Sequence, residues 1–400
     1  MSSFIQAYRV ALKRGAAVEV SRQASHQHEF NGTQALKKLF GDERLESIPS
    51  RWFFLRDDAP VITQEHRLTW YDSRADHPSR TEWRLYYDGQ PDLNEGDLIA
   101  IIRRQSDGDL VVLIAPAGST WERQLIALFG KPETAGGRFV EGQLENIPAA
   151  YLPVAQELFE FIGWVEHTVE PAVSDLERLI QRFGGGFPST SEFSAFARER
   201  EGAAIEDPDA TLFGWWRREE ALFEALEGRE LSARLQQPRP FKDADDFLGF
   251  SLSIQNRRKS RAGHALENHV RALFELKGIR FVRGMRTEGQ RRPDFILPGA
   301  IEYRDPSFSS DLLTMLAAKT TCRDRWRQVL SEASRIPKKH LLTLEAGISL
   351  DQLTEMHEEG IQLVVLKSLS STYNPPPGMT LLSVAEFLAE AEKKQARLRN

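Results

Sequence analysis

The sequence predicts a protein of two domains, the first built mainly of β-strands and the second of mixed α/β class. Between Trp52 and Ile114, short apolar strand-like segments alternate with turns, whereas after Ser251 helix-like and strand-like segments alternate in an ordered way. The chain has 400 residues, of which 41% are hydrophobic, so it is long enough to bury more than one core.

The strand-like segments of the N-terminal half are separated by turn-forming residues such as Asp88-Gly89-Gln90-Pro91. Helical periodicity is found over residues 33–40 and 119–129. These features predict a small β-barrel or sandwich with one or two helices. The expected strands cover residues 52–55, 68–71, 83–87, 98–102 and 110–114.

The domain boundary is expected in a glycine-, proline- and serine-rich stretch that includes Gly184-Gly185-Gly186 and Pro188. We therefore expect an N-terminal domain over residues 1–165, a linker over 166–186 and a C-terminal domain over 187–400. In the C-terminal domain, the order of elements fits a mixed sheet flanked by helices. Helices are expected over 212–235, 264–277, 323–336, 350–357 and 384–395, and strands over 279–282, 294–297, 312–318, 340–344 and 361–366.

Composition narrows the class of protein. The formal net charge of −6 argues mildly against a general nucleic-acid binder, but residues 257–292 contain eleven Lys or Arg against three Glu, and residues 319–339 contain seven against two acids. Such runs are often only solvated surface, yet these two flank candidate catalytic residues.

The single cysteine, Cys322, excludes a disulfide framework and a four-cysteine zinc site. The sequence shows neither a membrane-length apolar run nor a signal-peptide pattern, which favours a cytoplasmic protein.

A set of acids and a lysine in the C-terminal half has the composition of a Mg2+-dependent phosphodiesterase site, in which carboxylates hold the metal and the amine orients water. Asp294 opens one expected strand and Lys319 ends the next, so both can lie at one edge of the sheet. The usual nuclease pattern has an acid two residues before the lysine, where this chain has Ala317. The missing acid is expected from Glu332, on the polar face of the following helix, with Glu267 as a further acid. Taken singly, each residue also fits an ordinary loop or surface position.

The triplet Arg323-Asp324-Arg325 begins the helix expected to carry Glu332. Arginine can donate two hydrogen bonds to guanine in the major groove and aspartate can accept one from cytosine, so the triplet suits adjacent G·C pairs. Asp324 as a helix cap, with the arginines paired to neighbouring acids, is an equally good interpretation from the chemistry alone.

Residues 253–267, which include Asn256-Arg257-Arg258-Lys259-Ser260-Arg261-Ala262-Gly263, and residues 318–328 closely resemble restriction endonucleases of the EcoRII type. With gaps the likeness covers residues 187–388, including Arg292-Pro293-Asp294-Phe295. It implies a restriction-endonuclease-like core of the PD-(D/E)xK kind with a migrated glutamate. The positions it implies are Asp294, Lys319 and Glu332 for catalysis and metal binding, Glu267 as an additional acid, and Arg323, Asp324 and Arg325 for reading C·G pairs of CCWGG or CCNGG sites.

The N-terminal half resembles the effector-binding domain of the same family, a B3-like β pseudobarrel, more faintly. The matching run is Arg80-Thr81-Glu82-Trp83-Arg84, in which Arg80, Glu82 and Arg84 fit DNA-contacting positions. The run 26–32 lies where the other recognition arm is expected, and a DNA-contacting or plain surface loop is favoured there over a metal site. The resemblance also implies base flipping, autoinhibition by the N-terminal domain until it binds a second DNA site, and a companion DNA methyltransferase.

The function expected from these observations is a type II site-specific deoxyribonuclease that cleaves double-stranded DNA, needs Mg2+ and leaves 5′-phosphate ends. A two-fold DNA site favours a homodimer joined through the C-terminal halves. Two rival functions remain open at this point. One is a DNA-binding regulator without catalytic activity, and the other is a repair or modification-dependent nuclease.

Overall fold

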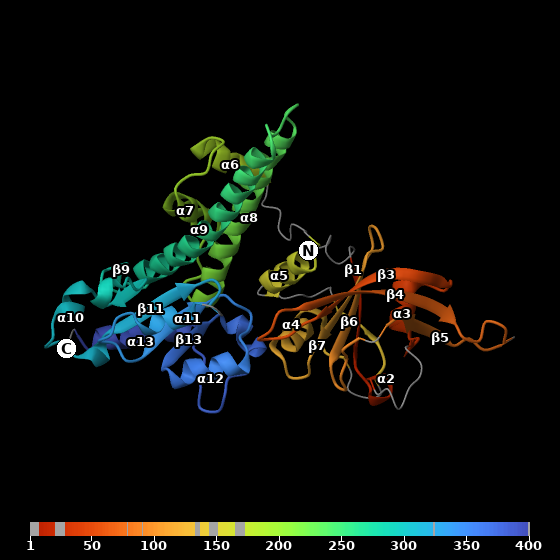
Figure 1. Ribbon diagram of the computed structural model, residues 1–400. Coiled ribbons are helices and arrows are strands. Elements are labelled where there is room, and N and C mark those ends of the chain that lie inside the picture. Colours follow the sequence, from red (N-terminus) through yellow and green to blue (C-terminus); the bar gives the residue numbers. More distant parts are fainter. Residues whose placement is uncertain are drawn as a thin grey trace. The chain divides into compact units, whose positions relative to one another are not determined.

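The computed structural model describes residues 8–20, 29–77, 79–89, 91–132, 137–143, 151–164, 173–322 and 325–398. The chain divides into two compact units (Figure 1). The first comprises Met1–Thr168 with the short segments Ala346–Ser349 and Thr372–Asn374, and the second comprises the remainder. Among the described helices, none combines the length and the apolar character that a membrane span requires.

The first unit is built on an eight-stranded sheet with the order β2-β5-β4-β3-β7-β6-β1-β8. Strands β3 and β7 pair in parallel, and the other neighbouring strands pair antiparallel. The strands are β1 (Tyr8–Arg14), β2 (Glu29–Asn31), β3 (Leu45–Phe54), β4 (Ile62–Asp72), β5 (Trp83–Tyr87), β6 (Leu98–Arg104), β7 (Leu110–Ala115) and β8 (Val140–Glu141). The five strands and two helices expected from the sequence of this half are confirmed.

Aromatic and branched side chains on one face of the strands form the core of this unit, with Trp52, Trp70 and Leu85 fully buried. The helices begin where hydroxyl side chains cap them. Thr33 accepts from the backbone N–H of Leu36 at the start of α3 (Gln34–Phe40), and Ser119 caps α4 (Thr120–Phe129) in the same way. The short α2 (Ala17–Val20) and α5 (Leu152–Phe161) complete the described helices of this half.

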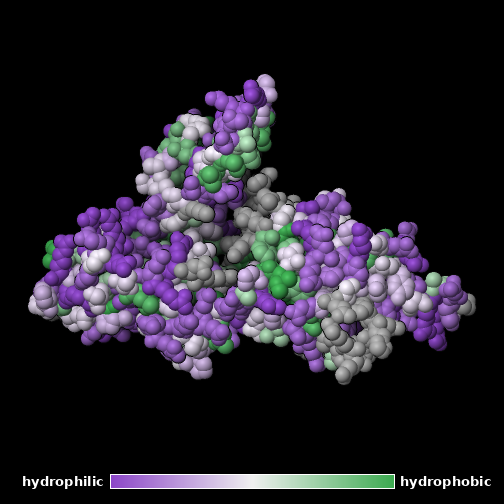
Figure 2. Space-filling view, viewed as in Figure 1, coloured by the Kyte–Doolittle hydropathy of each residue, from purple (hydrophilic) through white to green (hydrophobic). Residues whose placement is uncertain are grey.

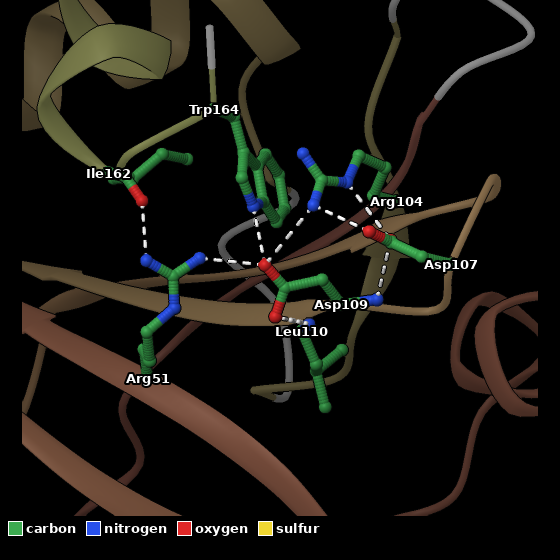
Figure 3. Close-up of polar contacts among 7 residues, drawn as sticks. All are labelled: Arg51, Arg104, Asp107, Asp109, Leu110, Ile162 and Trp164. Carbon is green, nitrogen blue, oxygen red and sulfur yellow. Dashed lines mark hydrogen bonds and ion pairs between the residues drawn. The ribbon is translucent and has the colours of Figure 1, made fainter.

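A polar cluster joins β3, the turn before β7 and the segment that follows α5 (Figure 3). Asp109 Oδ2 accepts hydrogen bonds from Arg51 Nη2 at 2.7 Å and from Trp164 Nε1 at 2.6 Å, and Arg104 Nη2 lies 3.6 Å away. Arg51 also donates through Nη1 to the carbonyl oxygen of Ile162 at 2.6 Å. One carboxylate therefore links segments that are far apart in the sequence.

Replacing this carboxylate by an amide is expected to destabilise the first unit. Burial alone would raise the pKa of Asp109, but the Trp164 hydrogen bond and the Arg51 charge hold it below its ordinary value. Since the folded-state pKa is lowered, the stabilisation is present above about pH 4 and is lost as the pH falls through the folded pKa. Asp109→Asn is expected to lower the free energy of unfolding at pH 7 by about 1–3 kcal/mol in urea denaturation. Asp76→Asn, at an exposed aspartate, is the matched control; equal stability of Asp109→Asn and wild type would contradict the role of the cluster.

The second unit contains a five-stranded mixed sheet with the order β13-β12-β11-β10-β9. Strands β11, β12 and β13 are parallel, and β10 pairs antiparallel with both β11 and β9. All residues of β12 and β13 are buried, as expected for parallel strands covered on both faces. The elements are β9 (Val282–Arg283), β10 (Phe295–Leu297), α10 (Ala300–Arg304), β11 (Thr314–Lys319), α11 (Trp326–Leu330), β12 (Lys339–Thr343), α12 (Leu350–Glu358), β13 (Ile361–Val365) and α13 (Val384–Ala396).

Helices α6 (Val173–Phe183), α7 (Thr190–Glu201), α8 (Pro208–Leu235) and α9 (Ala244–Leu276) precede this sheet in the chain. Helix α6 falls within the segment expected to be a linker, 166–186. Its Leu179 packs in an apolar cluster with side chains of α7 and α8 such as Phe193 and Phe223. Helices α8 and α9 run side by side (Figure 1), tied by Arg234–Asp246 at 3.1 Å. Figure 2 shows apolar surface toward the free end of this pair, where the exposed apolar side chains are Leu231, Leu235, Phe247, Leu248 and Leu252.

Three expected elements of the second unit are wrong in extent. The helix expected over 264–277 is the last part of the longer α9 (Ala244–Leu276). The strand expected over 279–282 is present only at Val282–Arg283, and the helix expected over 323–336 is limited to Trp326–Leu330 among the described residues. The apolar spacing that predicted a helix over 323–336 continues to Ala333, but this residue has φ 46°, which a right-handed helix does not allow. The side chain of Ala333 is buried, but it is part of a turn and not of a helix.

Candidate active site

Asp294 and Lys319 meet at one edge of the five-stranded sheet. Because β10 is antiparallel to β11, with Phe295 opposite Leu316, the residue before β10 lies beside the end of β11. Asp294 Oδ2 accepts a hydrogen bond from Lys319 Nζ at 2.8 Å and another from the backbone N–H of Ala318 at 2.8 Å. The two side chains are partly exposed, by 13% for Asp294 and 21% for Lys319, so the pair is accessible to a ligand.

The position that usually carries the second acid is occupied by a buried small residue. Ala317 lies in the middle of β11 with no exposed surface, and the antiparallel register places it across from Asp294. Alanine supplies no carboxylate opposite Asp294, so a second acid for this site has to come from another element.

Glu332 lies close enough to Asp294 for their charges to interact. It is part of the turn after α11, where its N–H donates to the carbonyl of Val329 at 3.1 Å, so its expected position on a helix is wrong. Burial and the negative charge of Asp294 raise the pKa of Glu332 to about 7, against the opposing effect of Lys319. Its Oε2 atom is buried and has no hydrogen-bond partner within the described part of the chain. A buried carboxylate oxygen without a donor, next to a second carboxylate, is an arrangement that a cation stabilises.

The donor set fits a divalent cation that prefers oxygen ligands. Within the described ranges, no group of three or more His, Cys, Asp or Glu side chains is suited to hold a metal. Asp294 and Glu332 provide two carboxylates, and Mg2+ in proteins is commonly held by one or two carboxylates, with water and substrate phosphate as the other ligands. These residues therefore fit Mg2+ better than a metal ion whose ligands are all supplied by the protein.

Glu267 is separated from this pair by an arginine. It lies on α9, and its Oε2 accepts from Arg283 Nη2 at 2.7 Å and Nε at 3.1 Å. Arg283 also donates to Asn268 and pairs in the sheet with Phe295, the residue after Asp294. The structure thus places Glu267 one side chain away from β10, with its charge balanced by Arg283 rather than by Lys319.

The expected DNA-reading triplet is only partly described. Arg323 and Asp324 lie outside the described residues, whereas Arg325 is exposed immediately before α11. The sequence analysis missed Glu345, which follows β12 and is buried; its Oε2 accepts from the backbone N–H of Cys322 at 2.9 Å. The position of Glu345, shortly after the apolar strand β12, could have indicated an acid that binds the chain segment following β11.

In the first unit, the structure brings Glu82 and Arg84 together but leaves Arg80 apart. Glu82 forms ion pairs with Arg84 and, at 2.5 Å, with Arg74, and both arginines hold its pKa below the ordinary value. Arg84 also donates to Asn31 on β2. Arg80 is exposed to solvent. Residues 26–28 of the other expected arm lie outside the described residues.

Comparison with known proteins shows what the second unit resembles. Residues 223–388 match the family model described as "EcoRII C terminal". The chain is 42% identical over 259 residues to the type II restriction enzyme EcoRII of Escherichia coli, a match covering 64% of this chain and 61% of that enzyme. It is 26% identical over 149 residues to the type II restriction enzyme SsoII of Shigella sonnei, covering 33% of this chain and 48% of that enzyme. The chain thus spans less than two thirds of either relative.

The solved structures that match include metal-depleted Ecl18kI in complex with uncleaved DNA, with a TM-score of 0.44 and 19% sequence identity. That match covers 57% of this chain and 87% of the other chain. A second structure of metal-depleted Ecl18kI, with uncleaved, modified DNA, has a TM-score of 0.43.

Proposed function

We propose that this protein is a type II site-specific endonuclease that hydrolyses both strands of double-stranded DNA with Mg2+. The observation that carries the proposal is the Asp294–Lys319 pair beside Glu332, whose buried Oε2 has no hydrogen-bond partner among the described residues, in a segment that matches the EcoRII C-terminal family model. The sequence similarity to EcoRII supports the same reaction class.

In the proposed mechanism, Asp294 and Glu332 would hold Mg2+, which would supply a lower pKa for the attacking water and offset the charge that develops on the phosphate. Lys319 lies beside Asp294 and orients the water toward the phosphorus. Arg291, whose charge lowers the pKa of Glu332, adds positive charge on the same side. Glu267 acts through Arg283, which it orients next to β10. The products carry 5′-phosphates.

Site recognition is proposed to rest on Arg323, Asp324 and Arg325, which would read the C·G pairs of a CCWGG or CCNGG site in the major groove. The central base pair would be flipped out and sensed through unstacking. A homodimer joined through the second unit would place one catalytic site on each strand of a two-fold site. Double-stranded DNA is the substrate, and we place the protein in the cytoplasm beside a companion DNA methyltransferase that protects the same sites.

The first unit is proposed to be a B3-like pseudobarrel that binds a second copy of the DNA site. Arg80, Glu82 and Arg84 would contact this effector DNA, with Arg80 available to a phosphate because it is exposed. Until that DNA is bound, the first unit would restrain cleavage by the second.

Cleavage of sequenced plasmids by the full chain tests the proposal. With Mg2+, discrete fragments with 5′-phosphate ends at one short site are expected, and a plasmid with two sites is expected to be cut faster than a plasmid with one. Equal rates on the two plasmids would remove the effector role of the first unit. A smear would indicate a repair nuclease, cutting only of methylated plasmid would indicate a modification-dependent enzyme, and DNA binding without cutting would indicate a regulator.

A further inference from the structure

Glu288 contacts both α10 and the turn that carries Glu332. It begins the 3-10 turn η2 (Glu288–Gln290), in the loop that leads to Asp294. Its carboxylate oxygens accept from the hydroxyl of Tyr303 at 2.7 and 2.9 Å. The same carboxylate accepts from the backbone N–H of Ser334 at 3.4 Å, two positions after Glu332. Glu288 is therefore connected to Asp294 through the chain and to the Glu332 turn through a hydrogen bond.

The turn that carries Glu332 is held in a conformation that its own sequence disfavours. Ala333 has φ 46°, in the left-handed region that alanine rarely occupies, and its side chain is buried. A residue in such a conformation persists when the surrounding structure over-determines it. Arg335 supplies part of that constraint, because its guanidinium donates to the carbonyls of Tyr303 and, at 2.8 Å, Phe308. Tyr303 of α10 thus holds this turn through its own carbonyl and through Glu288.

A restraint on the Glu332 turn is needed because this carboxylate is buried without a compensating hydrogen bond. Glu332 Oε2 is buried and gains no hydrogen bond from the described residues. Because burying an unpaired polar atom costs free energy, a turn without an external tie would favour an orientation in which the carboxylate reaches solvent. The tie has to join the Glu332 turn to the Asp294 loop, and these are the two segments that Glu288 connects.

We propose that Glu288 and Tyr303 form a positioning pair that holds Glu332 beside Asp294 before a metal ion binds, and so set the affinity for that ion. The proposal rests on the function proposed above, since it assigns the two carboxylates to a divalent cation. Neither Glu288 nor Tyr303 touches the reacting atoms; both act through the backbone of the Glu332 turn.

The variants Glu288→Gln and Tyr303→Phe of the full chain test the pair, with Mn2+ binding to the DNA-free protein measured by electron paramagnetic resonance. Each variant is expected to weaken Mn2+ binding by about tenfold, the usual effect of losing a residue that orients a metal ligand. The Mg2+ concentration for half-maximal cleavage is expected to rise by a similar factor, while the rate at saturating Mg2+ stays within about twofold of wild type. Glu275→Gln, at a half-exposed glutamate paired with Arg271 on α9, is the matched control and should leave both values unchanged.

Thermal unfolding without metal separates this role from a structural one. Lower stability in both variants with unchanged Mn2+ binding would overturn the proposal, and so would a loss of cleavage that saturating Mg2+ does not restore. If Glu288→Gln fails to fold, Tyr303→Phe alone decides, because it removes only the hydroxyl and keeps the ring. If the wild-type protein binds Mn2+ but never cuts DNA, the proposed function is refuted. The positioning role is then decided by Mn2+ binding alone, compared between the wild type and the two variants.

Discussion

Asp294→Asn is expected to reduce DNA cleavage at saturating Mg2+ by on the order of 10³-fold, the size of effect seen when a group that stabilises developing charge is removed. Asparagine has the same shape and keeps an oxygen that can accept from the N–H of Ala318, but it loses the charge that binds a cation and pairs with Lys319. Lys319→Met is expected to give a similar loss, because its side chain keeps the length and apolar character of lysine without the amine.

The measurement is the single-turnover rate on a plasmid with mapped cut sites, together with the affinity for the same DNA in Ca2+. Binding is expected to remain within about tenfold of wild type, since both substitutions act on the chemical step. Asp311→Asn changes an exposed aspartate of the same unit and should cleave normally. Near-normal cleavage by Asp294→Asn would refute the assigned site, whereas loss of DNA binding together with cleavage would point to a folding defect.

Glu332→Gln is expected to abolish cleavage and also to stabilise the metal-free protein above pH 7. The pKa of Glu332 is raised from 4.5 to about 7 in the fold by burial and by Asp294. Between these values the folded state keeps a proton that the unfolded state has lost, so the free energy of unfolding falls as the pH rises through that window. Glutamine removes this penalty, which amounts to on the order of 2 kcal/mol at pH 8 after allowance for partial solvent exposure.

Thermal unfolding in EDTA at pH 8 and at pH 4.5 checks the sign. The variant is expected to melt at a higher temperature than wild type at pH 8, and the difference should shrink toward zero at pH 4.5, where Glu332 is protonated in the fold. Wild-type metal affinity is expected to rise with pH up to about 7, because the ion displaces a proton from this carboxylate. A variant less stable than wild type at pH 8 would show that Glu332 supports the fold rather than opposing it.

Local sequence patterns were sufficient to predict most of the helices and strands of both units. Period-two and continuous apolar segments identified the central strands, because strands buried on one or both faces need those patterns. Strands β10 and β11 follow one another in the chain and pair antiparallel, so the start of β10 lies beside the end of β11. This is why the sequence could place Asp294 and Lys319 at one edge of the sheet.

Local patterns failed where long-range contacts control the backbone. The apolar spacing of Trp326, Val329 and Ala333 is helical, yet the helix ends at Leu330, because Arg335 is bonded to carbonyls of another segment and Ala333 takes a left-handed conformation. The linker prediction did not include α6, although Leu176, Leu179, Ile180 and Phe183 have the spacing of one helix face. These side chains pack with residues of α7 and α8.

Side-chain identity and short-range spacing were enough to predict the order of most strands and helices, the basic surroundings of the candidate site and the residue types that carry its chemistry. Three features required the three-dimensional arrangement: the burial of Glu332 Oε2 without a hydrogen-bond partner among the described residues, the pairing of Glu267 with Arg283, and the link that Glu288 makes to the Glu332 turn. These properties depend on distance and burial between residues remote in the chain, and the free energy of a charge depends on both.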